Sequence, residues 1–503
     1  MGRPDKKFYQ LIISRLDGER LSSASYRQHC AELVRKGIGG FILFGGSRYE
    51  TGGFIAELQS LSRVPLFIAS DIERGVGQQV QGYTVFPSQM AVAAALGRHR
   101  PGAVKILEEA VDAVAEEAID AGINMPLIPV MDVNSNPDNP IICTRAFSGN
   151  PLDVAWYGCV YIRVLERAGL ISCAKHFPGH GDTSVDSHIA LPVIPKPLKE
   201  LMHTDIHPFR EAVRAGVGGI MVGHLAVTAV DPQLPASLSE KVITGLLREE
   251  LGYSGLILTD ALNMHALNEY ENVPARCINA GVDILLHPAD ADAAAEELRH
   301  AVATGEISEA KIDRAAQRIL NYKSALRRIK NPVPPDRGAH AALSGLISTM
   351  AVTLVKDRGG LLPLRDAAGA CLVFCGDGDE HDLSPLRDFI GGGHRCINTR
   401  ELSLPNSACN TVICALFTDI AAWKGGAGIS NEQKEAVRRL IGRAQRSIVI
   451  SFGSPYVLRD FAEAGVLIAA YDTGRQAQLS VIRCLTGESD FTGSLPVALG
   501  GID

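Results

Sequence analysis

The densest group of reactive side chains is the segment from Lys175 to His188, which reads KHFPGHGDTSVDSH. Three histidines, two aspartates and one lysine fall within these fourteen residues. The segment follows an apolar run at residues 170–174, and its proline and glycines predict a loop. A polar surface loop has a similar composition. However, loops that a rigid scaffold positions also carry catalytic residues, and the number of titratable groups favours that interpretation.

Within this loop, Asp186 and His188 have the spacing of an acid/base pair. A carboxylate two residues from a histidine can accept its ring proton, fix its tautomer and maintain its basicity, which a general acid/base near neutral pH needs. A metal site is the alternative, since His176 and His180 offer further nitrogen ligands. No HExxH spacing is present, and Lys175 places a cation beside His176. We therefore expect no metal.

A second carboxylate, Asp260, ends the apolar run at residues 255–259. A helix is expected to begin after it, so Asp260 taken alone is equally well interpreted as a helix N-cap. In combination with the Asp186–His188 pair, Asp260 is predicted to be a nucleophile.

The first 330 residues alternate short apolar runs with amphipathic helical stretches such as residues 104–121 and 241–250. This alternation predicts a parallel α/β sheet. Eight units favour a (β/α)8 barrel of the TIM type, because an open doubly wound sheet, the alternative, rarely has so many. The predicted strands are residues 9–16, 40–44, 65–71, 122–132, 170–176, 218–224, 255–260 and 281–286.

Five of these runs end in polar side chains: Asp71, Asp132, Lys175-His176, His224 and Asp260. The catalytic groups of such barrels lie at the carboxyl ends of the strands. One polar ending is readily explained as a turn residue, whereas five together predict an active site.

Three prolines in four residues, at positions 332–335, follow a helical pattern at residues 308–328 and predict an interdomain linker. We expect a barrel catalytic domain at residues 1–330, a linker at 331–345 and a second domain at 346–503. The second half has short buried runs separated by helical stretches at 431–444 and 475–485, which predict a smaller α/β sandwich with a parallel sheet. The runs are residues 370–375, 411–416, 447–452 and 466–471.

The Lys175–His188 segment resembles the signature of glycoside hydrolase family 3, in its β-N-acetylglucosaminidase branch: Lys-His-Phe-Pro-Gly-His-Gly, four residues, then Asp-Ser-His. The resemblance extends over both halves of the chain and implies a barrel followed by an αβα sandwich. Further similar segments are Ser70-Asp71-Ile72-Glu73, Asn139-Pro140, Arg145-Ala146-Phe147-Ser148, Gly453-Ser454-Pro455-Tyr456 and Gly493-Ser494-Leu495-Pro496-Val497.

The resemblance implies roles for seven residues. It makes Asp260 the nucleophile, His188 the acid/base and Asp186 the partner of His188. It implies contacts to the sugar in the −1 subsite for Asp71, Arg145, Lys175 and His176.

The chain departs from the family at two positions. Arg74-Gly75 follow Glu73 where two glycines are usual, and Ala261 stands where the residue after the nucleophile is often acidic. Both departures concern the outer subsites rather than the main chemistry.

The implied reaction is a retaining exo-hydrolysis of terminal β-linked N-acetylglucosamine through a covalent glycosyl-aspartate, with no metal or organic cofactor. A histidine acid/base is neutral once deprotonated, so it repels an anionic acceptor less than a carboxylate does. A β-N-acetylglucosaminide phosphorylase is therefore an alternative. A family 3 β-glucosidase, a second alternative, takes its acid/base from the second domain and lacks Asp-Ser-His. A silent sugar-binding relative would be expected to lose Asp260 or His188, and both are present.

The composition limits the classes of binding partner that we expect for this chain. A net charge of −7, a pI near 6.1 and the absence of a Lys/Arg cluster give no reason to expect nucleic acid. The sequence has no run of 18 apolar residues, so no membrane span is expected. The N-terminus has no apolar run of signal-peptide length. The eleven scattered cysteines are expected to be mostly reduced, which predicts a cytoplasmic protein. The expected partner is a small N-acetylglucosaminide, either a peptidoglycan fragment, the family's usual substrate, or a chitin oligomer.

Overall fold

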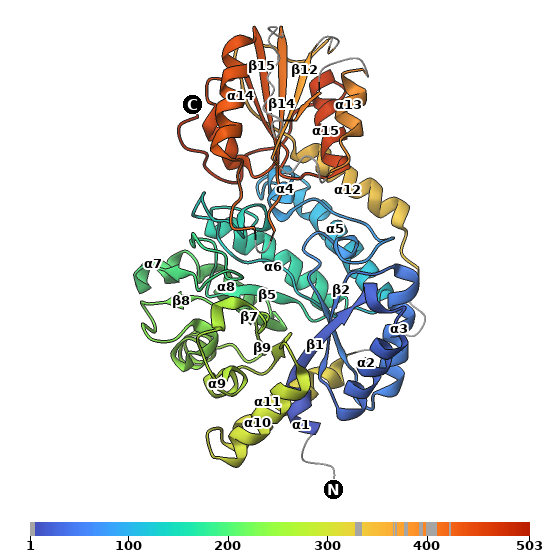
Figure 1. The fold of residues 1–503 in the computed structure, drawn as a ribbon, viewed down its shortest axis with the longest axis vertical. Coiled ribbons are helices and arrows are strands. Elements are labelled where there is room, and N and C mark those ends of the chain that lie inside the picture. The colour runs from blue at the N-terminus through green and yellow to red at the C-terminus, as the bar shows by residue number, and fades with distance from the viewer. Residues whose placement is uncertain are drawn as a thin grey trace. The chain divides into compact units, whose positions relative to one another are not determined.

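A computed structural model describes residues 6–326, 334–365, 367, 370–376, 381–391, 396–398, 410–421 and 424–502. The chain forms two compact units (Figure 1). The first comprises Met1–Val85, Glu108–Val133 and Pro151–His340, and the second comprises Phe86–Leu107, Asn134–Asn150 and Ala341–Asp503. The start of the predicted linker, residues 331–333, lies outside the described residues. The domain limits at residues 330 and 346 stay a prediction.

A five-stranded parallel sheet forms half a barrel in the first unit, in the order β10-β1-β2-β3-β4. Two of its inner strands, Gly40–Phe44 and Phe67–Ser70, are almost continuously buried, as expected for strands covered on both faces. The strands are β1 (Ile12–Asp17), β2 (Gly40–Phe44), β3 (Phe67–Ser70), β4 (Met125–Pro126) and β10 (Leu285–Leu286).

A second parallel sheet in the first unit has the order β5-β7-β9. Its strands are β5 (Cys173–Phe177), β7 (Gly219–Val222) and β9 (Leu256–Thr259). Two isolated parallel bridges, Val130 with Lys175 and Leu258 with Ile284, lie between the segments of the two sheets. Each of the eight predicted runs overlaps one of the eight strands of these two sheets, so the predicted parallel α/β fold is confirmed.

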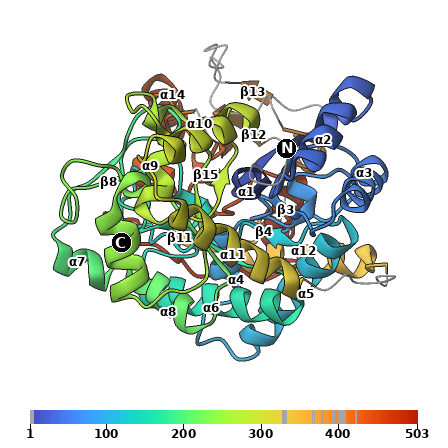
Figure 2. The ribbon, with the colours of Figure 1, turned by 90° about the horizontal axis from the view of Figure 1, so that it is seen from below.

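Helices follow most of the strands, and Figure 2 shows α2, α3, α5, α6 and α8 along the rim of the first unit. Local signals explain their limits: Ser23 caps the start of α2, and Gly37, with φ +99°, ends it in the left-handed conformation. The helices are α1 (Lys6–Gln10), α2 (Ala24–Lys36), α3 (Arg48–Leu61), α5 (Ala103–Asp120), α6 (Pro151–Arg167), α7 (Leu198–His203), α8 (His207–Arg214), α9 (Val273–Ala280), α10 (Ala291–Ala303) and α11 (Glu309–Ala325).

The helical stretch predicted at residues 241–250 is present as a wide π-type helix, Lys241–Glu250. A short parallel pair, β6 (Val193–Ile194) and β8 (Ala226–Val227), follows the Lys175–His188 segment. Across the described ranges, no helix has both the length and the apolar character needed to cross a bilayer.

The second unit is built on a six-stranded sheet in the order β11-β16-β15-β14-β12-β13. The four predicted strands are present and parallel, and they are flanked by β13 and by the antiparallel edge strand β11, neither of which was predicted. The strands are β11 (Thr353–Asp357), β12 (Cys371–Gly376), β13 (Cys396–Asn398), β14 (Thr411–Thr418), β15 (Arg446–Gly453) and β16 (Val466–Ala469).

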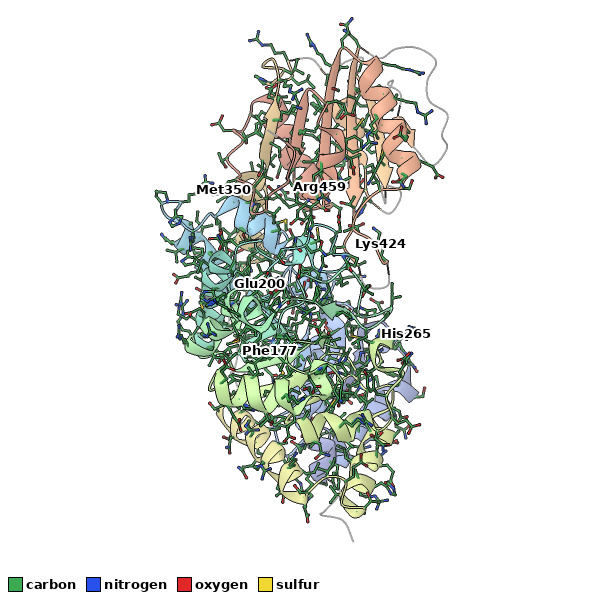
Figure 3. All side chains as sticks on the ribbon, turned by 90° about the vertical axis from the view of Figure 1, so that its left-hand side faces the viewer. Phe177, Glu200, His265, Met350, Lys424 and Arg459 are labelled. Carbon is green, nitrogen blue, oxygen red and sulfur yellow. The ribbon has the colours of Figure 1, made fainter. Side chains whose placement is uncertain are left out.

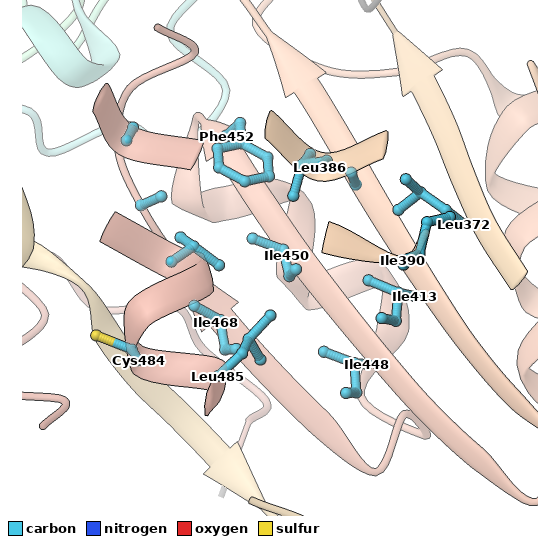
Figure 4. Packing of buried hydrophobic residues seen from close by; sticks show 14 of the residues in the cluster. Leu372, Leu386, Ile390, Ile413, Ile448, Ile450, Phe452, Ile468, Cys484 and Leu485 are labelled. Carbon is cyan, nitrogen blue, oxygen red and sulfur yellow. The ribbon is translucent and has the colours of Figure 1, made fainter. Parts of the chain in front are cut away.

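Helices cover both faces of this sheet, as predicted for a sandwich: α14 (Asn431–Arg443) lies on the opposite side from α13 (Ser384–Phe389) and α15 (Arg475–Thr486) (Figure 1). Alternate strand residues point to one face and pack against α13 and α15 (Figure 4). This cluster includes Leu372, Leu386, Ile390, Ile413, Ile448, Ile450, Phe452, Ile468, Cys484 and Leu485.

Two segments from the first half of the sequence belong to the second unit. One carries α4 (Gln89–Ala95), which is buried along its whole length. The hydroxyl of Ser88 donates to the carbonyl of Tyr471 at 3.0 Å. The hydroxyl of Ser148 donates to the carbonyl of Pro496 at 2.7 Å. No sequence signal assigns either segment to the second unit, so the sequence did not predict this exchange. The helix α12 (Arg337–Ala351) leads into the second half.

Candidate active site

The polar strand endings of the first unit meet because its strands are parallel. Asp71 directly follows β3, Lys175 and His176 lie within β5, and Asp260 directly follows β9. Parallel strands place their carboxyl ends at one edge, where catalytic groups are found in folds of this kind. Phe177, labelled in Figure 3, ends β5 and is fully buried. Its ring packs edge-on against that of Phe209, with the ring centroids 5.3 Å apart.

Lys175 is the buried centre of an ion-pair group. Its Nζ lies 2.6 Å from Oδ1 of Asp71 and 2.7 Å from Oε1 of Glu73. The lysine side chain is 2% exposed and that of Glu73 is 7% exposed, whereas that of Asp71 is 30% exposed. A buried ammonium requires such partners. Glu73 therefore balances the lysine from inside, and Asp71 presents its carboxylate toward solvent, where a sugar hydroxyl can reach it.

Asp132 anchors the start of the histidine-rich loop. Its Oδ2 accepts from Nδ1 of His176 at 2.7 Å. Its Oδ1 accepts from the backbone N–H groups of His176, at 3.2 Å, and His180, at 2.6 Å. Burial by itself raises the pKa of this carboxyl, but His176 and His180 outweigh it and hold the pKa below its ordinary value. The ionised carboxylate can only accept, so it orients the His176 ring with Nδ1–H toward the protein.

A second buried histidine holds the middle of the loop. Nδ1 of His180 lies 2.7 Å from the hydroxyl of Thr183, which itself donates to the His180 carbonyl at 3.0 Å. Nε2 of His180 lies 3.2 Å from the hydroxyl of Ser187. The ring therefore bonds to the residue between Asp186 and His188 and holds that part of the loop.

The predicted Asp186–His188 contact is present. Oδ1 of Asp186 lies 2.8 Å from Nδ1 of His188 and accepts from the His188 backbone N–H at 2.9 Å. The carboxylate side chain is fully buried, and the imidazole is 24% exposed. Because Nδ1 is engaged by an acceptor, Nε2 is the ring nitrogen that can exchange a proton with a ligand.

Asp260 is fixed at the end of β9. Its backbone N–H donates to the carbonyl of Val222 at 2.9 Å, and its Oδ1 accepts from the N–H of Ala261 at 2.8 Å. Burial raises the pKa of Asp260, but the nearby His176 and His224, the Ala261 N–H and His188 together bring it below its ordinary value. The carboxylate is therefore ionised over the neutral range, as a nucleophile must be.

The expected helix directly after Asp260 is absent. The chain turns instead, and the next helical turn begins only at His265, with Met264 in its N-cap position. Asp260 accepts a hydrogen bond from the next residue rather than from the second or third residue of a helix. The N-cap interpretation of Asp260 is therefore wrong.

Arg145, the seventh predicted site residue, belongs to the second unit. It ends a single helical turn, Cys143–Arg145, and its Nη1 donates to the carbonyl of Ile141 at 3.0 Å. The other six residues, namely Asp71, Lys175, His176, Asp186, His188 and Asp260, all lie in the first unit.

The supporting residues Glu73, Thr183 and Ser187 carry no sequence signal of their own beyond their place inside the motifs. Their partners are set by the fold. Over the described stretches of the chain, no group of three or more His, Cys, Asp or Glu side chains is arranged to hold a metal ion.

We predict that Asp132→Asn lowers the free energy of unfolding by about 3 kcal/mol or more at neutral pH, because it breaks a buried ionic group. The pKa of Asp132 is lower in the folded chain, so its contribution is fully present above its unfolded pKa and is lost as pH falls through the lowered value. Denaturant unfolding of both proteins across this range measures the difference, which should shrink with acid. A constant difference would contradict the ionic role.

Comparison with known proteins identifies the family. The model of the glycosyl hydrolase family 3 N terminal domain matches residues 4–322. A β-hexosaminidase A from Pseudoalteromonas piscicida is 34% identical over 378 residues, which are 67% of this chain and 62% of that relative's length. A β-N-acetylglucosaminidase/β-glucosidase from Cellulomonas fimi is 28% identical over 92% of this chain and 88% of its own.

Among solved structures, a family 3 β-N-acetylglucosaminidase from Paenibacillus sp. str. FPU-7 superposes with a TM-score of 0.85 at 28% identity, covering 99% of each chain. The resemblance inferred from the Lys175–His188 segment is thereby confirmed at the level of the family, and the chain belongs to glycosyl hydrolase family 3.

Proposed function

We propose that this protein is a retaining exo-β-N-acetylglucosaminidase that works through a covalent glycosyl-Asp260 intermediate. The observation that carries the proposal is the pairing of a partly exposed, ionised Asp260 with the Asp186–His188 dyad in one unit. His188 is close enough for its charge to lower the pKa of Asp260. The names of the relatives, β-hexosaminidase and β-N-acetylglucosaminidase, support the substrate class.

In the first step, an Asp260 carboxylate oxygen attacks C1 of the sugar and the bond from C1 to the leaving oxygen breaks. The imidazolium of His188 gives its Nε2 proton to that oxygen as it departs. The buried Asp186 carboxylate stabilises the imidazolium through Nδ1–H.

In the second step, neutral His188 takes a proton from water through Nε2, and the water oxygen attacks C1. The bond between C1 and Asp260 breaks, the carboxylate is restored, and the β configuration returns. We propose that Asp71, Lys175 and His176 hold the sugar hydroxyls in the −1 subsite.

We also propose that the two parallel sheets of the first unit close into a complete (β/α)8 barrel, which serves as the catalytic domain. The Val130–Lys175 and Leu258–Ile284 bridges support this closure, since each lies where an edge of one sheet meets an edge of the other.

The proposed substrate is a peptidoglycan fragment that carries a terminal N-acetylglucosamine, degraded in the cytoplasm. Two other activities are favoured by specific observations. A phosphorylase is consistent with an acid/base that is neutral when deprotonated. A β-glucosidase is consistent with the double name of the Cellulomonas fimi relative.

Turnover of aryl β-N-acetylglucosaminide and aryl β-glucoside, each with and without phosphate, tests the proposal. We expect hydrolysis of the first substrate at a rate that does not depend on phosphate. Faster turnover with phosphate, with sugar-1-phosphate as the product, would establish the phosphorylase. A preference for the glucoside would overturn the assigned substrate.

We predict that EDTA leaves this turnover unchanged, because the mechanism uses only a carboxylate and an imidazole. The rate is measured after prolonged incubation with chelator, and again after zinc is restored. If chelation inactivates the enzyme and zinc reactivates it, the His176 and His180 imidazoles would have to be reconsidered as metal ligands.

A further inference from the structure

The backbone directly after β9 is held by hydrogen bonds, two of which involve a side chain. The N–H of Asp260 donates to the Val222 carbonyl at 2.9 Å, and the N–H of Ala261 donates to Oδ1 of Asp260 at 2.8 Å. The carbonyl of Ala261 accepts from Nε2 of His224 at 3.2 Å. His224 follows β7, the strand that pairs with β9, so the two strand ends bring the groups together.

The tautomer of His224 follows from its partners. A carbonyl only accepts hydrogen bonds, so Nε2 of His224 must carry the proton that reaches Ala261. Nδ1 lies 2.8 Å from the hydroxyl of Ser237. Burial lowers the pKa of His224, although Asp260 opposes this, and the ring is neutral at neutral pH. Nδ1 of a neutral ring accepts, so Ser237 donates to it and holds the ring in the tautomer that Ala261 requires.

Neither His224 nor Ser237 is exposed at all. A side chain without accessible surface cannot touch a substrate that enters from solvent, so His224 takes no direct part in the proposed reaction. It can act only through the backbone that it holds. The position of that backbone matters, because an attacking carboxylate displaced by about 1 Å can cost roughly a hundredfold in rate.

From this geometry we infer that His224 is a positioning residue for the nucleophile: it fixes the Ala261 carbonyl, and with it the Ala261 N–H that orients the carboxylate of Asp260. Ser237 fixes the ring of His224. The inference rests on the proposed role of Asp260 and adds two residues, far along the sequence from the dyad loop, to the machinery that supports it.

Two substitutions at His224 separate the hydrogen bond from the presence of a polar side chain. The amide of His224→Gln extends to the level of Nε2 and can still donate to the Ala261 carbonyl. The amide of His224→Asn is one methylene shorter, so it reaches Ser237 but not Ala261. Neither variant carries a titratable ring. We expect His224→Asn to lower kcat for aryl β-N-acetylglucosaminide about a hundredfold with KM little changed, and His224→Gln to keep most of the rate.

The pH profile of kcat/KM distinguishes the positioning role of His224 from a purely structural one, which would leave the profile unchanged. The Ala261 N–H helps to hold the pKa of Asp260 below its ordinary value. The carbonyl and the N–H of Ala261 lie in successive peptide units joined at its Cα, so loss of the His224 bond in His224→Asn loosens the Ala261 backbone, weakens the N–H bond and raises the pKa of Asp260. Since the ionised carboxylate is the reactive form, the acid limb of kcat/KM should move to higher pH in His224→Asn and stay near the wild-type position in His224→Gln. Ser237→Ala should give a smaller shift in the same direction.

Asp260→Asn is measured in parallel, and thermal unfolding checks that each variant is folded. Equal losses in His224→Gln and His224→Asn with an unmoved acid limb would overturn the inference, as would wild-type activity in both. If His224→Asn does not fold, His224→Gln and Ser237→Ala still test the inference. It requires the acid limb to move to higher pH in Ser237→Ala and to stay near the wild-type position in His224→Gln. If Asp260→Asn is inactive while the His224 variants behave as wild type, the proposed function stands and only the positioning role falls. An active Asp260→Asn would remove both.

Discussion

Replacing Asp260 with asparagine should lower turnover by at least about four orders of magnitude while the protein stays folded. Asparagine has nearly the same shape and can still accept from the Ala261 N–H, but its amide oxygen cannot form the glycosyl ester. Because the pKa of Asp260 is lowered in the folded chain, its charge contributes to stability at neutral pH, so the variant should be somewhat less stable than the wild type while staying folded. Initial rates with aryl β-N-acetylglucosaminide and thermal unfolding measure the two effects.

The exposed Asp388 on α13 offers a matched control, since Asp388→Asn makes the same change of charge and shape in the second unit. We expect its rate to equal that of the wild type. If Asp260→Asn kept activity within tenfold of the wild type, the covalent route through this carboxylate would have to be abandoned.

The second large effect is expected for His188→Ala, and it should depend on the leaving group. A nitrophenolate departs without much help, whereas a sugar alkoxide needs a proton, so the loss in kcat/KM should reach about 10²- to 10⁴-fold for a disaccharide and be much smaller for the aryl substrate. Deglycosylation should slow for both substrates because the base is also lost. A glycosyl-Asp260 should then accumulate and be visible by mass spectrometry.

Azide tests whether the His188 imidazole is the general base. A small anion can enter the space that the imidazole leaves in His188→Ala and attack C1 without a general base. We expect azide to speed turnover of aryl substrates by His188→Ala and to give the β-glycosyl azide. Asp186→Ala should show a weaker form of the same pattern, since its carboxylate only orients and tunes the ring. The exposed His203 of α7 serves as control, with no effect expected for His203→Ala.

Equal slowing of aryl and disaccharide substrates, without a trapped intermediate or azide rescue, would make His188 a binding residue. The acid/base would then have to be sought elsewhere, beginning with the second unit.

The strands and the dyad were predictable because their signals are local. The apolar runs of the first half are bounded by glycine and polar residues, and each overlaps a strand, because a short run of buried residues between turns suits a strand covered on both faces. Asp186 and His188 are two residues apart, so their contact requires only a turn of the loop between them.

The hydrogen-bond and ion-pair partners that hold the site residues in place were not predictable in the same way. The partners of Lys175 come from the end of another strand, 104 residues away in the case of Asp71, and only the order of the strands decides which carboxylate reaches the lysine. His224 was recognised as a polar strand ending, but its bond to Ala261 depends on the pairing of β7 with β9. The turn after Asp260 differs from the predicted helix start, because an aspartate after a strand is common to both structures.

The second unit includes Phe86–Leu107 and Asn134–Asn150, and this fixes the order in which the protein can fold during synthesis. Ser88 and Ser148 leave the ribosome early, yet their bonding partners Tyr471 and Pro496 are made 383 and 348 residues later. Until then α4 lacks these later partners in its own unit, and exposed apolar surface of this kind favours aggregation of nascent chains. We therefore expect a gene shortened after residue 340 to give an insoluble product rather than an isolated catalytic half.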